Sequence, residues 1–380
     1  MHTHNLDIIV GTRPNFIKAA ALFAIANQFT DLNLRLIHTG QHGNASMSDI
    51  FFSELGLPTP ACRLDVTNTS HATQTADIMK GYERWIDKNI PDMCVVVGDV
   101  NSTLACALVA AKSNIPIAHV EAGLRSFDRK MPEEINRIAT DALSSLLFAT
   151  EPSAVENLKN EGQKCIHHVG NVMIDTLFRM KKQAKQIDIL HRFKLIPNGY
   201  AYATLHRPSN IENKKTLNEI INQIIWLSSV IPVVFPVHPR TKRQLMNFEL
   251  YSDLINTKNC VLMEPIGYLE SIATLMRSRI VVTDSGGLQE ETTALGIPCL
   301  TLRGNTERPI TVTHGTNLII GNDWELFRNT TRQIVDGLYL HRTPSIPLWD
   351  GKSGKKILQI CAEYLRTCNR ASQKTTATLL

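Results

Sequence analysis

The sequence contains no long apolar run and no closely spaced cysteine pair. No window of the 380 residues approaches the roughly 18 consecutive apolar residues that a membrane-spanning helix needs, so no membrane partner is expected. The eight cysteines lie far apart, without a CxxC pair or a nearby histidine cluster, and are expected to be buried free thiols and not metal ligands. The N-terminus has no Lys or Arg before its short apolar stretch, unlike a secretory signal. These absences predict a cytoplasmic protein that needs no metal.

A basic run is absent as well. The 40 Lys and Arg residues exceed the 35 Asp and Glu residues by a net charge of +5, which is spread along the chain. This distribution argues against nucleic acid as a partner. The hydrophobic and charged fractions, 43% and 20%, are those of a globular protein, and the chain is longer than one ordinary domain of about 150 residues. We therefore expect two domains.

Short β-branched runs alternate with helical stretches such as 16–28 and 101–112, a pattern typical of α/β proteins. The strands expected in the first half are 6–10, 34–38, 93–97, 117–120 and 146–149. Those expected in the second half are 200–204, 233–237, 260–263, 280–283, 299–302 and 317–320. We predict two doubly wound, Rossmann-like domains with parallel sheets, which cover 1–175, joined by a C-terminal helix at 354–370, and 176–350. In such folds, ligands bind in a cleft at the carboxyl ends of the strands.

The turn after the first strand lacks the GxGxxG fingerprint of dinucleotide-binding proteins. It reads Gly11-Thr12-Arg13-Pro14 and is followed by Lys18 one helical turn later. An Arg and a Pro in this turn argue against NAD or FAD, so no cofactor is expected. Arg13 is instead expected to bind an anion at the helix N-terminus, unless it is a solvent-exposed loop residue.

Two carboxylates follow neighbouring strands. Asp99 comes after the third strand in GDVNST, and Glu121 comes 22 residues later in HVEAGLR, one strand-helix-strand step along the chain. If the strands are adjacent, the two side chains lie close together at the sheet edge, in an arrangement suited to proton transfer. The alternative for Asp99 is a helix N-cap, whereas a charged residue that ends an apolar run, such as Glu121, has no such explanation.

The segment MPEEINR reads as a helix start with Pro and two acids in its first turn. Glu133 and Arg137 lie four residues apart on one face of this helix. By spacing alone, the expected role of this pair is an i,i+4 ion pair.

In the second half, two histidines follow strand ends. His206 and His238 both precede an arginine by one or two residues, and such a pair suits a phosphate contact or a proton donor. A histidine packed within the fold is the alternative for each.

The strongest local signal is TDSGGLQEE. Ser285, Gly286 and Gly287 form a small turn that opens a helix, and their backbone N–H groups can point at a diphosphate. Glu291 lies one and a half turns further on, where it can bind a ribose diol. Arg308, in TERP, follows another strand and provides a further cation for the phosphates. The alternative is a simple tight turn with a serine cap.

The order of these motifs is itself informative: GTRP, TGQH, GDVNST, HVEAGLRS, MPEEINR, DSGGLQEE and TERP. Over about 6–320 the chain resembles the non-hydrolysing UDP-N-acetylglucosamine (UDP-GlcNAc) 2-epimerases. The resemblance implies a glycosyltransferase-B fold, a homodimer, and inversion at sugar C2. In this reaction UDP is eliminated, a 2-acetamidoglucal intermediate forms, and UDP adds again. It also implies that Asp99, Glu121 and Glu133 are the essential acids and that His206 is the active-site histidine.

The resemblance suggests further binding residues. Arg13, His206 and Arg308 are expected to support the departing diphosphate, and Lys18, Arg137 and His238 are counted with the substrate-binding residues. Asn15 stands where the family usually has Glu, and 43–49 departs from the segment that helps form the family's second, activating UDP-sugar site.

Alternatives to this activity remain open. The neighbourhood of Phe51-Phe52 resembles relatives that act on UDP-sugars modified at C3 or C6, such as UDP-2,3-diacetamido-glucuronate. A glycosyltransferase-B enzyme or a non-catalytic UDP-sugar sensor would share the nucleotide cradle. The three acids favour proton chemistry over both.

Overall fold

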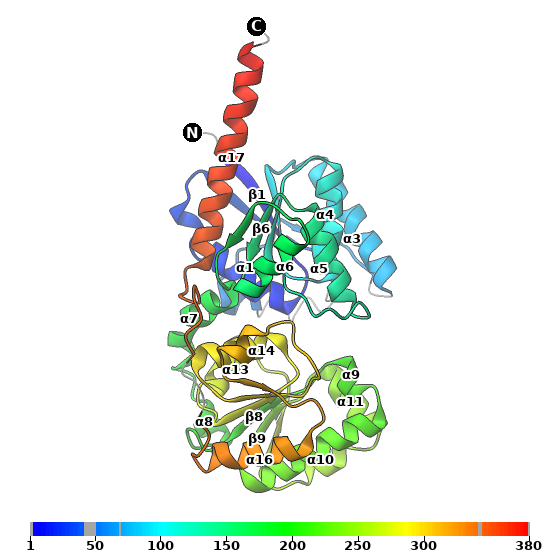
Figure 1. The fold of residues 1–380 in the computed structure, drawn as a ribbon. Coiled ribbons are helices and arrows are strands. Elements are labelled where there is room, and N and C mark those ends of the chain that lie inside the picture. The colour runs from blue at the N-terminus through cyan, green and yellow to red at the C-terminus, as the bar shows by residue number, and fades with distance from the viewer. Residues whose placement is uncertain (1–2, 42–50, 68–69, 341–343, 379–380) are drawn as a thin grey trace. The chain divides into compact units, whose positions relative to one another are not determined.

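The computed structural model describes residues 3–41, 51–67, 70–340 and 344–378, and their side chains up to residue 368 (Figure 1). The departing segment 43–49 therefore lies outside the described residues. The chain divides into two compact units, Met1–Thr176 with Pro347–Leu380, and Leu177–Ile346. The chain passes from the first to the second within helix α7 (Val172–Ala184).

The first unit is built on a parallel sheet with strand order β3-β2-β1-β4-β5-β6-β7. The strands are β1 (His4–Val10), β2 (Leu32–His38), β3 (Cys62–Arg63), β4 (Met93–Val97), β5 (Ile117–Ala122), β6 (Leu146–Ala149) and β7 (Ile166–His168). The strand order reverses between β1 and β4, as in a doubly wound sheet. Every residue of β4 and β5 is buried; this explains why β4 is a continuous apolar run that does not alternate, whereas β5 carries two buried polar residues, His119 and Glu121.

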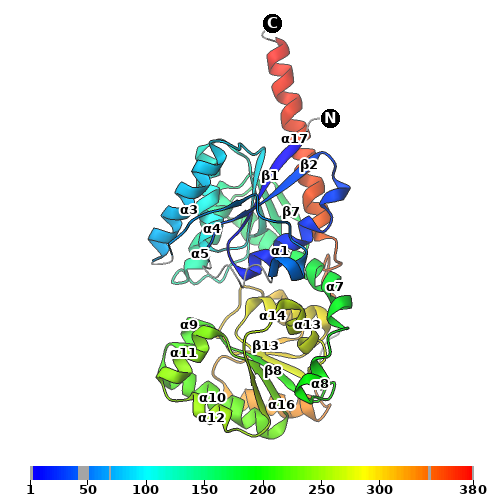
Figure 2. The ribbon, with the colours of Figure 1, turned by 180° about the vertical axis from the view of Figure 1, so that it is seen from behind.

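Helices cover this sheet on both faces (Figure 2). They are α1 (Arg13–Phe23), the short 3-10 helix η1 (Ala26–Gln28), α3 (His71–Ile86), α4 (Asn101–Lys112), α5 (Pro132–Leu143), α6 (Pro152–Asn160), the start of α7, and α17 (Ser353–Thr378). The C-terminal helix α17 packs against α1, although it lies far away in sequence. The half-buried carboxylate of Asp175 accepts a hydrogen bond from the N–H of Gly354 (2.8 Å) at the start of α17.

The second unit repeats this plan with strand order β10-β9-β8-β11-β12-β13. Its strands are β8 (Ala201–Thr204), β9 (Val233–Pro236), β10 (Cys260–Met263), β11 (Ile280–Thr283), β12 (Cys299–Thr301) and β13 (Asn317–Ile319). Its helices are α8 (Ile189–Phe193), α9 (Pro208–Ile211), α10 (Lys214–Val230), α11 (Pro239–Asn247), α12 (Tyr251–Ile255), α13 (Tyr268–Leu275), α14 (Gly286–Leu295), α15 (Ile310–Thr313) and α16 (Trp324–Val335). All the strand pairs are parallel.

The two sheets confirm the predicted fold class of two doubly wound, Rossmann-like sheets. The edge strands β3 and β7 were not expected, because they contain only two and three residues and no β-branched run. The helix expected at 16–28 begins earlier, at Arg13, because Pro14 fits the first turn of a helix, and it ends at Phe23.

The prediction of eight buried cysteines is only partly right. All eight are free thiols, but Cys165 and Cys368 are exposed, and Cys62 and Cys260 are half-buried. Cys165 directly precedes the edge strand β7, and Cys368 lies on the distal half of α17, so neither reaches a core. Within the described part of the chain, no helix is both long enough and apolar enough to cross a membrane.

Candidate active site

Glu121 occupies an unusual place at the end of β5. Its φ angle is 75°, in the left-handed region, and the pairing of β5 with β6 shifts register between Val120 and Ala122. A non-glycine residue held in this region costs roughly 1–3 kcal/mol and is found mostly at functional sites. The Glu121 side chain is 2% exposed and forms an ion pair with Lys18 of α1, which is itself 5% exposed. The bulge therefore turns a buried carboxylate toward a buried ammonium group.

The turn after β1 is tied to the end of β4 by Asn15. The Asn15 side-chain oxygen accepts the N–H of Thr12 (3.1 Å), and its amide group donates to the carbonyl of Val97 (2.9 Å). A Cβ added at Gly98 would lie 3.2 Å from Lys18 Nζ, so only glycine allows the ammonium group to approach so closely. Asn15, which stands where the family usually has Glu, therefore has a structural role: it joins the turn after β1 to the end of β4.

Arg13 begins α1 and is half-buried. Its guanidinium carbon lies 4.8 Å from the ring centre of Phe51, a cation–π distance. Its expected contact with an anion stays a prediction.

Asp99 is held by an arginine. Arg137 Nη1 lies 2.5 Å from Asp99 Oδ2, and Asn136 donates to the Asp99 carbonyl (2.9 Å). The alternative that Asp99 caps the following helix is wrong, because the N-cap of α4 is Val100 and no side chain caps it.

Asp99 and Glu121 do follow adjacent strands, as expected. Val97 of β4 pairs with Val120 of β5, and the N–H of Gly98 donates to the Val120 carbonyl (3.0 Å). What the sequence did not indicate is that each carboxylate has its own buried cation, Arg137 for Asp99 and Lys18 for Glu121.

The expected ion pair between Glu133 and Arg137 is replaced by another. Arg137, 2% exposed, bonds instead to Glu134, with Nη2 and Nε at 2.6 and 3.1 Å from its Oε2. The Glu134 carboxylate also accepts the backbone N–H groups of Ser126 and Phe127. Burial alone would raise the pKa of Glu134, but the Ser126 N–H and Arg137 outweigh it and hold the pKa below its usual value. Glu133 lies half-buried on the same turn.

Glu134 is therefore a site residue that the sequence reasoning missed. It joins the 126–127 loop to Arg137, and through Arg137 to Asp99. The doubled glutamate of MPEEINR was the available signal, but helix spacing cannot decide which of two adjacent acids turns inward.

In the second unit, Asp284 organises His206. This buried carboxylate accepts the N–H groups of His206 and Arg207 (3.0 and 2.9 Å), and His206 Nδ1 lies 2.9 Å from its Oδ1. Burial raises the pKa of Asp284, but the His206 hydrogen bond and charge outweigh it and hold the pKa below its usual value. Because Nδ1 is engaged, Nε2 is the ring nitrogen that can serve a ligand. The His206 side chain is 39% exposed, so a ligand can reach it.

His238 lies beside His206, with ring centres 5.8 Å apart. Its Nδ1 accepts the N–H of Arg240 and so caps α11, which is a structural role. Its contact with substrate stays a prediction.

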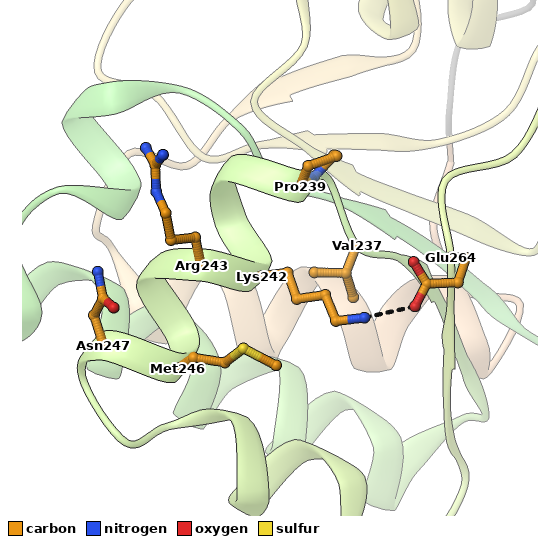
Figure 3. Close-up of a pocket in the computed structure, with 7 residues that line it drawn as sticks. All are labelled: Val237, Pro239, Lys242, Arg243, Met246, Asn247 and Glu264. Atoms are coloured by element: carbon orange, nitrogen blue, oxygen red, sulfur yellow. Dashed lines mark hydrogen bonds and ion pairs between the residues drawn. The ribbon is translucent and has the colours of Figure 1, made fainter. Parts of the chain in front are cut away.

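A pocket of about 310 Å³ lies along α11 (Figure 3). Its lining residues come from the loop after β9, from α11 and from the loop after β10: Val237, Pro239, Lys242, Arg243, Met246, Asn247 and Glu264. Lys242 and Glu264 form an ion pair at 2.6 Å within it. None of the residues predicted for the site lines this pocket.

The turn that opens α14 is largely as expected, with one correction. Ser285 is the N-cap residue but its side chain makes no capping hydrogen bond, so the alternative of a serine cap is wrong. The Ser285 N–H donates to Thr283 Oγ1 (3.0 Å) and is therefore not available to a diphosphate. Of the three backbone N–H groups predicted to bind a diphosphate, those of Gly286 and Gly287 remain. A Cβ at Gly286 would lie 2.8 Å from Arg308 Nη1, so this glycine lets the arginine approach the helix N-terminus.

Arg308 forms ion pairs with two glutamates. Its Nε lies 2.8 Å from Glu290 and its Nη1 lies 2.7 Å from Glu307, and the side chain is only 7% exposed. Arg303 binds the other oxygen of Glu307 (2.7 Å). Burial raises the pKa of Glu307, but Arg308 and Arg303 outweigh it and hold the pKa far below the usual range. Two carboxylates thus fix Arg308 beside Gly286.

Glu291 is also buried, at 4% exposed. Its Oε1 accepts a hydrogen bond from the hydroxyl of Tyr268 (2.9 Å), the first residue of α13. This tyrosine was not singled out in the sequence, because a lone tyrosine after a loop carries no motif.

The loss of folding stability at low pH should depend on Glu307. An unfolded glutamate, with its ordinary pKa of 4.5, takes up a proton at a pH where folded Glu307 is still ionised. The stabilisation that comes from the lowered pKa of Glu307 is therefore fully present above the ordinary pKa of 4.5, and it is lost as the pH falls below 4.5 toward the pKa of the folded state. We expect Glu307→Gln to lower the free energy of unfolding at pH 7 by about 3–5 kcal/mol, since it breaks a buried ion pair. We also expect a shallower decline from pH 5 to 3, measured by urea denaturation. An equally steep decline in the variant would contradict this.

The described residues contain no group of three or more His, Cys, Asp or Glu side chains placed to hold a metal ion.

Comparisons with known proteins give one consistent family. A family model described as UDP-N-acetylglucosamine 2-epimerase matches residues 25–362. The UDP-N-acetylglucosamine 2-epimerase of Methanocaldococcus jannaschii is 41% identical over 93% of this chain and 98% of that protein. The UDP-2,3-diacetamido-2,3-dideoxy-D-glucuronate 2-epimerase of Pseudomonas aeruginosa is 42% identical over 82% of this chain and 87% of that protein.

The solved structures agree with these relatives. The crystal structure of the M. jannaschii enzyme in complex with UDP-GlcNAc and UDP superposes with a TM-score of 0.87 at 41% identity. The match covers 94% of this chain and 99% of that one.

Proposed function

Because the chain belongs to the UDP-N-acetylglucosamine 2-epimerase family, we propose that it interconverts UDP-GlcNAc and its C2 epimer UDP-ManNAc without hydrolysing them. It is an isomerase, and the family resemblance seen in its motifs is confirmed. The observation that carries the proposal is Glu121. A strained, buried carboxylate paired with Lys18 next to the Asp99–Arg137 pair is an arrangement suited to proton chemistry.

The proposed reaction begins with loss of the C2 proton and of UDP. The C2–H bond is not activated by a neighbouring carbonyl, so its cleavage needs a carboxylate base held in place. One of Asp99, Glu121 and Glu133 accepts this proton while the C1–O bond to UDP breaks. The product pair is UDP and 2-acetamidoglucal.

The second half returns UDP to C1 and a proton to the opposite face of C2. A different carboxylate donates that proton, which explains why one acid is not enough. Lys18 and Arg137, each in contact with one acid, hold the carboxylates in fixed positions through both halves.

The second unit supplies the groups for the nucleotide. The N–H groups of Gly286 and Gly287, the hydroxyl of Ser285 and the Arg308 guanidinium bind the diphosphate, and Glu291 binds the ribose diol. His206, oriented by Asp284, stabilises the charge that develops on departing UDP. Arg13 adds a further cation.

A second substrate is favoured by one observation. The P. aeruginosa relative, named for a UDP-2,3-diacetamido-glucuronate substrate, is as similar to this chain as the M. jannaschii protein is. Comparing kcat/KM for the two UDP-sugars decides between them.

The test uses the purified protein with UDP-GlcNAc alone, in D2O. We expect UDP-ManNAc that carries deuterium at C2, because the carboxylate that protonates the opposite face of C2 has exchanged its proton with solvent. Proton NMR of the product reports both results. Turnover that needs an added sugar acceptor would indicate a glycosyltransferase, and binding without turnover would indicate a sensor. A C2 epimer without deuterium would overturn the elimination route.

The protein is further proposed to act in the cytoplasm as a homodimer. Eight free thiols, several of them exposed or half-buried, suit a reducing compartment. The homodimer is supported by the family resemblance.

A further inference from the structure

Asp141 of α5 holds both sides of the bulge that carries Glu121. Its Oδ1 lies 2.6 Å from His119 Nδ1, two residues before Glu121, and its Oδ2 accepts the N–H of Gly123 (3.1 Å), two residues after it. Arg125 Nη2 also donates to Oδ2 (2.7 Å). The two oxygens of the Asp141 carboxylate therefore bind the residues two positions before and two positions after the strained Glu121.

Both flanks have little room to move. Gly123 has a φ of 81°, and a Cβ there would lie 2.4 Å from the carbonyl oxygen of Ala154. Asp141 and His119 are both completely buried. A glutamate in the left-handed region is strained and persists only where its surroundings hold it there. Asp141 supplies that restraint.

His119 extends the restraint to the Asp99 turn. Its Nε2 lies 2.8 Å from the carbonyl oxygen of Gly98, the residue before Asp99. A carbonyl oxygen only accepts, so Nε2 donates this hydrogen bond, and the buried His119 ring thereby links Asp141 to the Asp99 turn.

We propose that Asp141 is a positioning residue for the epimerase reaction: acting through His119 and Gly123, it holds Glu121 and the Asp99 turn in their reactive geometry. This inference rests on the proposed function. Asp141 does not touch the substrate, and its contribution is to the placement of groups that do.

The experiment is Asp141→Asn in the full chain. An amide cannot accept at both oxygen positions, so one flank of the bulge is released. We expect kcat to fall about 10- to 100-fold, the effect of a small displacement of a reacting group, while the KM for UDP-GlcNAc and the affinity for UDP stay within about twofold.

The matched control is Asp7→Asn. Asp7, on β1 of the same unit, is an equally buried carboxylate bonded to Arg35 (2.7 Å) and Trp85 (3.0 Å), and not to the strand residues around Glu121. We expect it to lower the melting temperature while kcat is retained. If Asp141→Asn does not fold, His119→Gln carries the same expectation. The double variant should lose no more than the more severe single one.

The outcomes separate two failures. A wild type that does not epimerise UDP-GlcNAc would overturn the proposed function and this inference with it. An active wild type with a folded Asp141→Asn variant of unchanged kcat, or one that loses no more than Asp7→Asn, would overturn the inference alone.

Discussion

Glu121→Gln is expected to lower kcat about 100-fold or more, with little change in UDP affinity. The substitution keeps the shape of the side chain but removes the group that takes up and releases a proton, and a general acid or base contributes about 10²- to 10⁴-fold. UDP affinity is expected to persist because the groups proposed to bind it, apart from Arg13, belong to the second unit, and the substitution leaves Arg13 in place. Initial rates with UDP-GlcNAc and calorimetry with UDP measure the two effects.

The Glu121→Gln variant leaves Lys18 buried without a carboxylate partner at position 121, so the folding of the variant is checked by thermal denaturation. Asp99→Asn is expected to behave in the same way, since the structure removes the helix cap as an explanation for Asp99. Glu83→Gln, an exposed acid on α3, is the matched control and should turn over normally. A folded Glu121→Gln enzyme with wild-type kcat would show that Glu121 is not part of the proton chemistry.

The second large effect is expected on binding. Ser285→Ala combined with Glu291→Ala removes a hydroxyl proposed for the diphosphate and a carboxylate proposed for the ribose. Each charged hydrogen bond lost should weaken UDP binding by about 1.5–3 kcal/mol, or about 10- to 150-fold. Calorimetry with UDP gives the change directly.

The matched control for this pair is Ser229→Ala with Glu325→Ala. Both residues are exposed on outer helices of the same unit, and the Ser229 hydroxyl bonds only within its helix, to the Trp226 carbonyl. UDP affinity should be unchanged there. If the Ser285 and Glu291 double variant binds UDP as tightly as the wild type, the nucleotide is bound elsewhere.

Much of the fold could be read from the sequence. β4, β6 and β11 have the predicted bounds, because a strand buried on both faces must be a continuous apolar run. The edge strand β10 also has the predicted bounds, because its four residues are all apolar. The short edge strands β3 and β7 have no such requirement, so their sequences carry no signal.

The candidate site shows a sharper division. The sequence alone determined which segments carry polar groups, because the loops after parallel strands meet at one edge of a sheet, and this placed Asp99 and Glu121 after neighbouring strands. It could not determine the pairing of charges. Helix spacing favoured Glu133 as the partner of Arg137, but the side chain that turns inward is Glu134.

Only the tertiary structure decided the remaining features. One is the left-handed backbone of Glu121. The contacts that hold this residue, its pairing with Lys18 and the bonds of Asp141 to His119 and Gly123, join residues that lie 18 to 103 positions apart in the chain. The ion pair of Asp284 with His206 and the hydrogen bond of Tyr268 to Glu291 also join residues that lie far apart in the chain. Local propensity and spacing act over a few residues, whereas these contacts form only after two sheets have been assembled, and their geometry follows from which buried polar groups must satisfy one another.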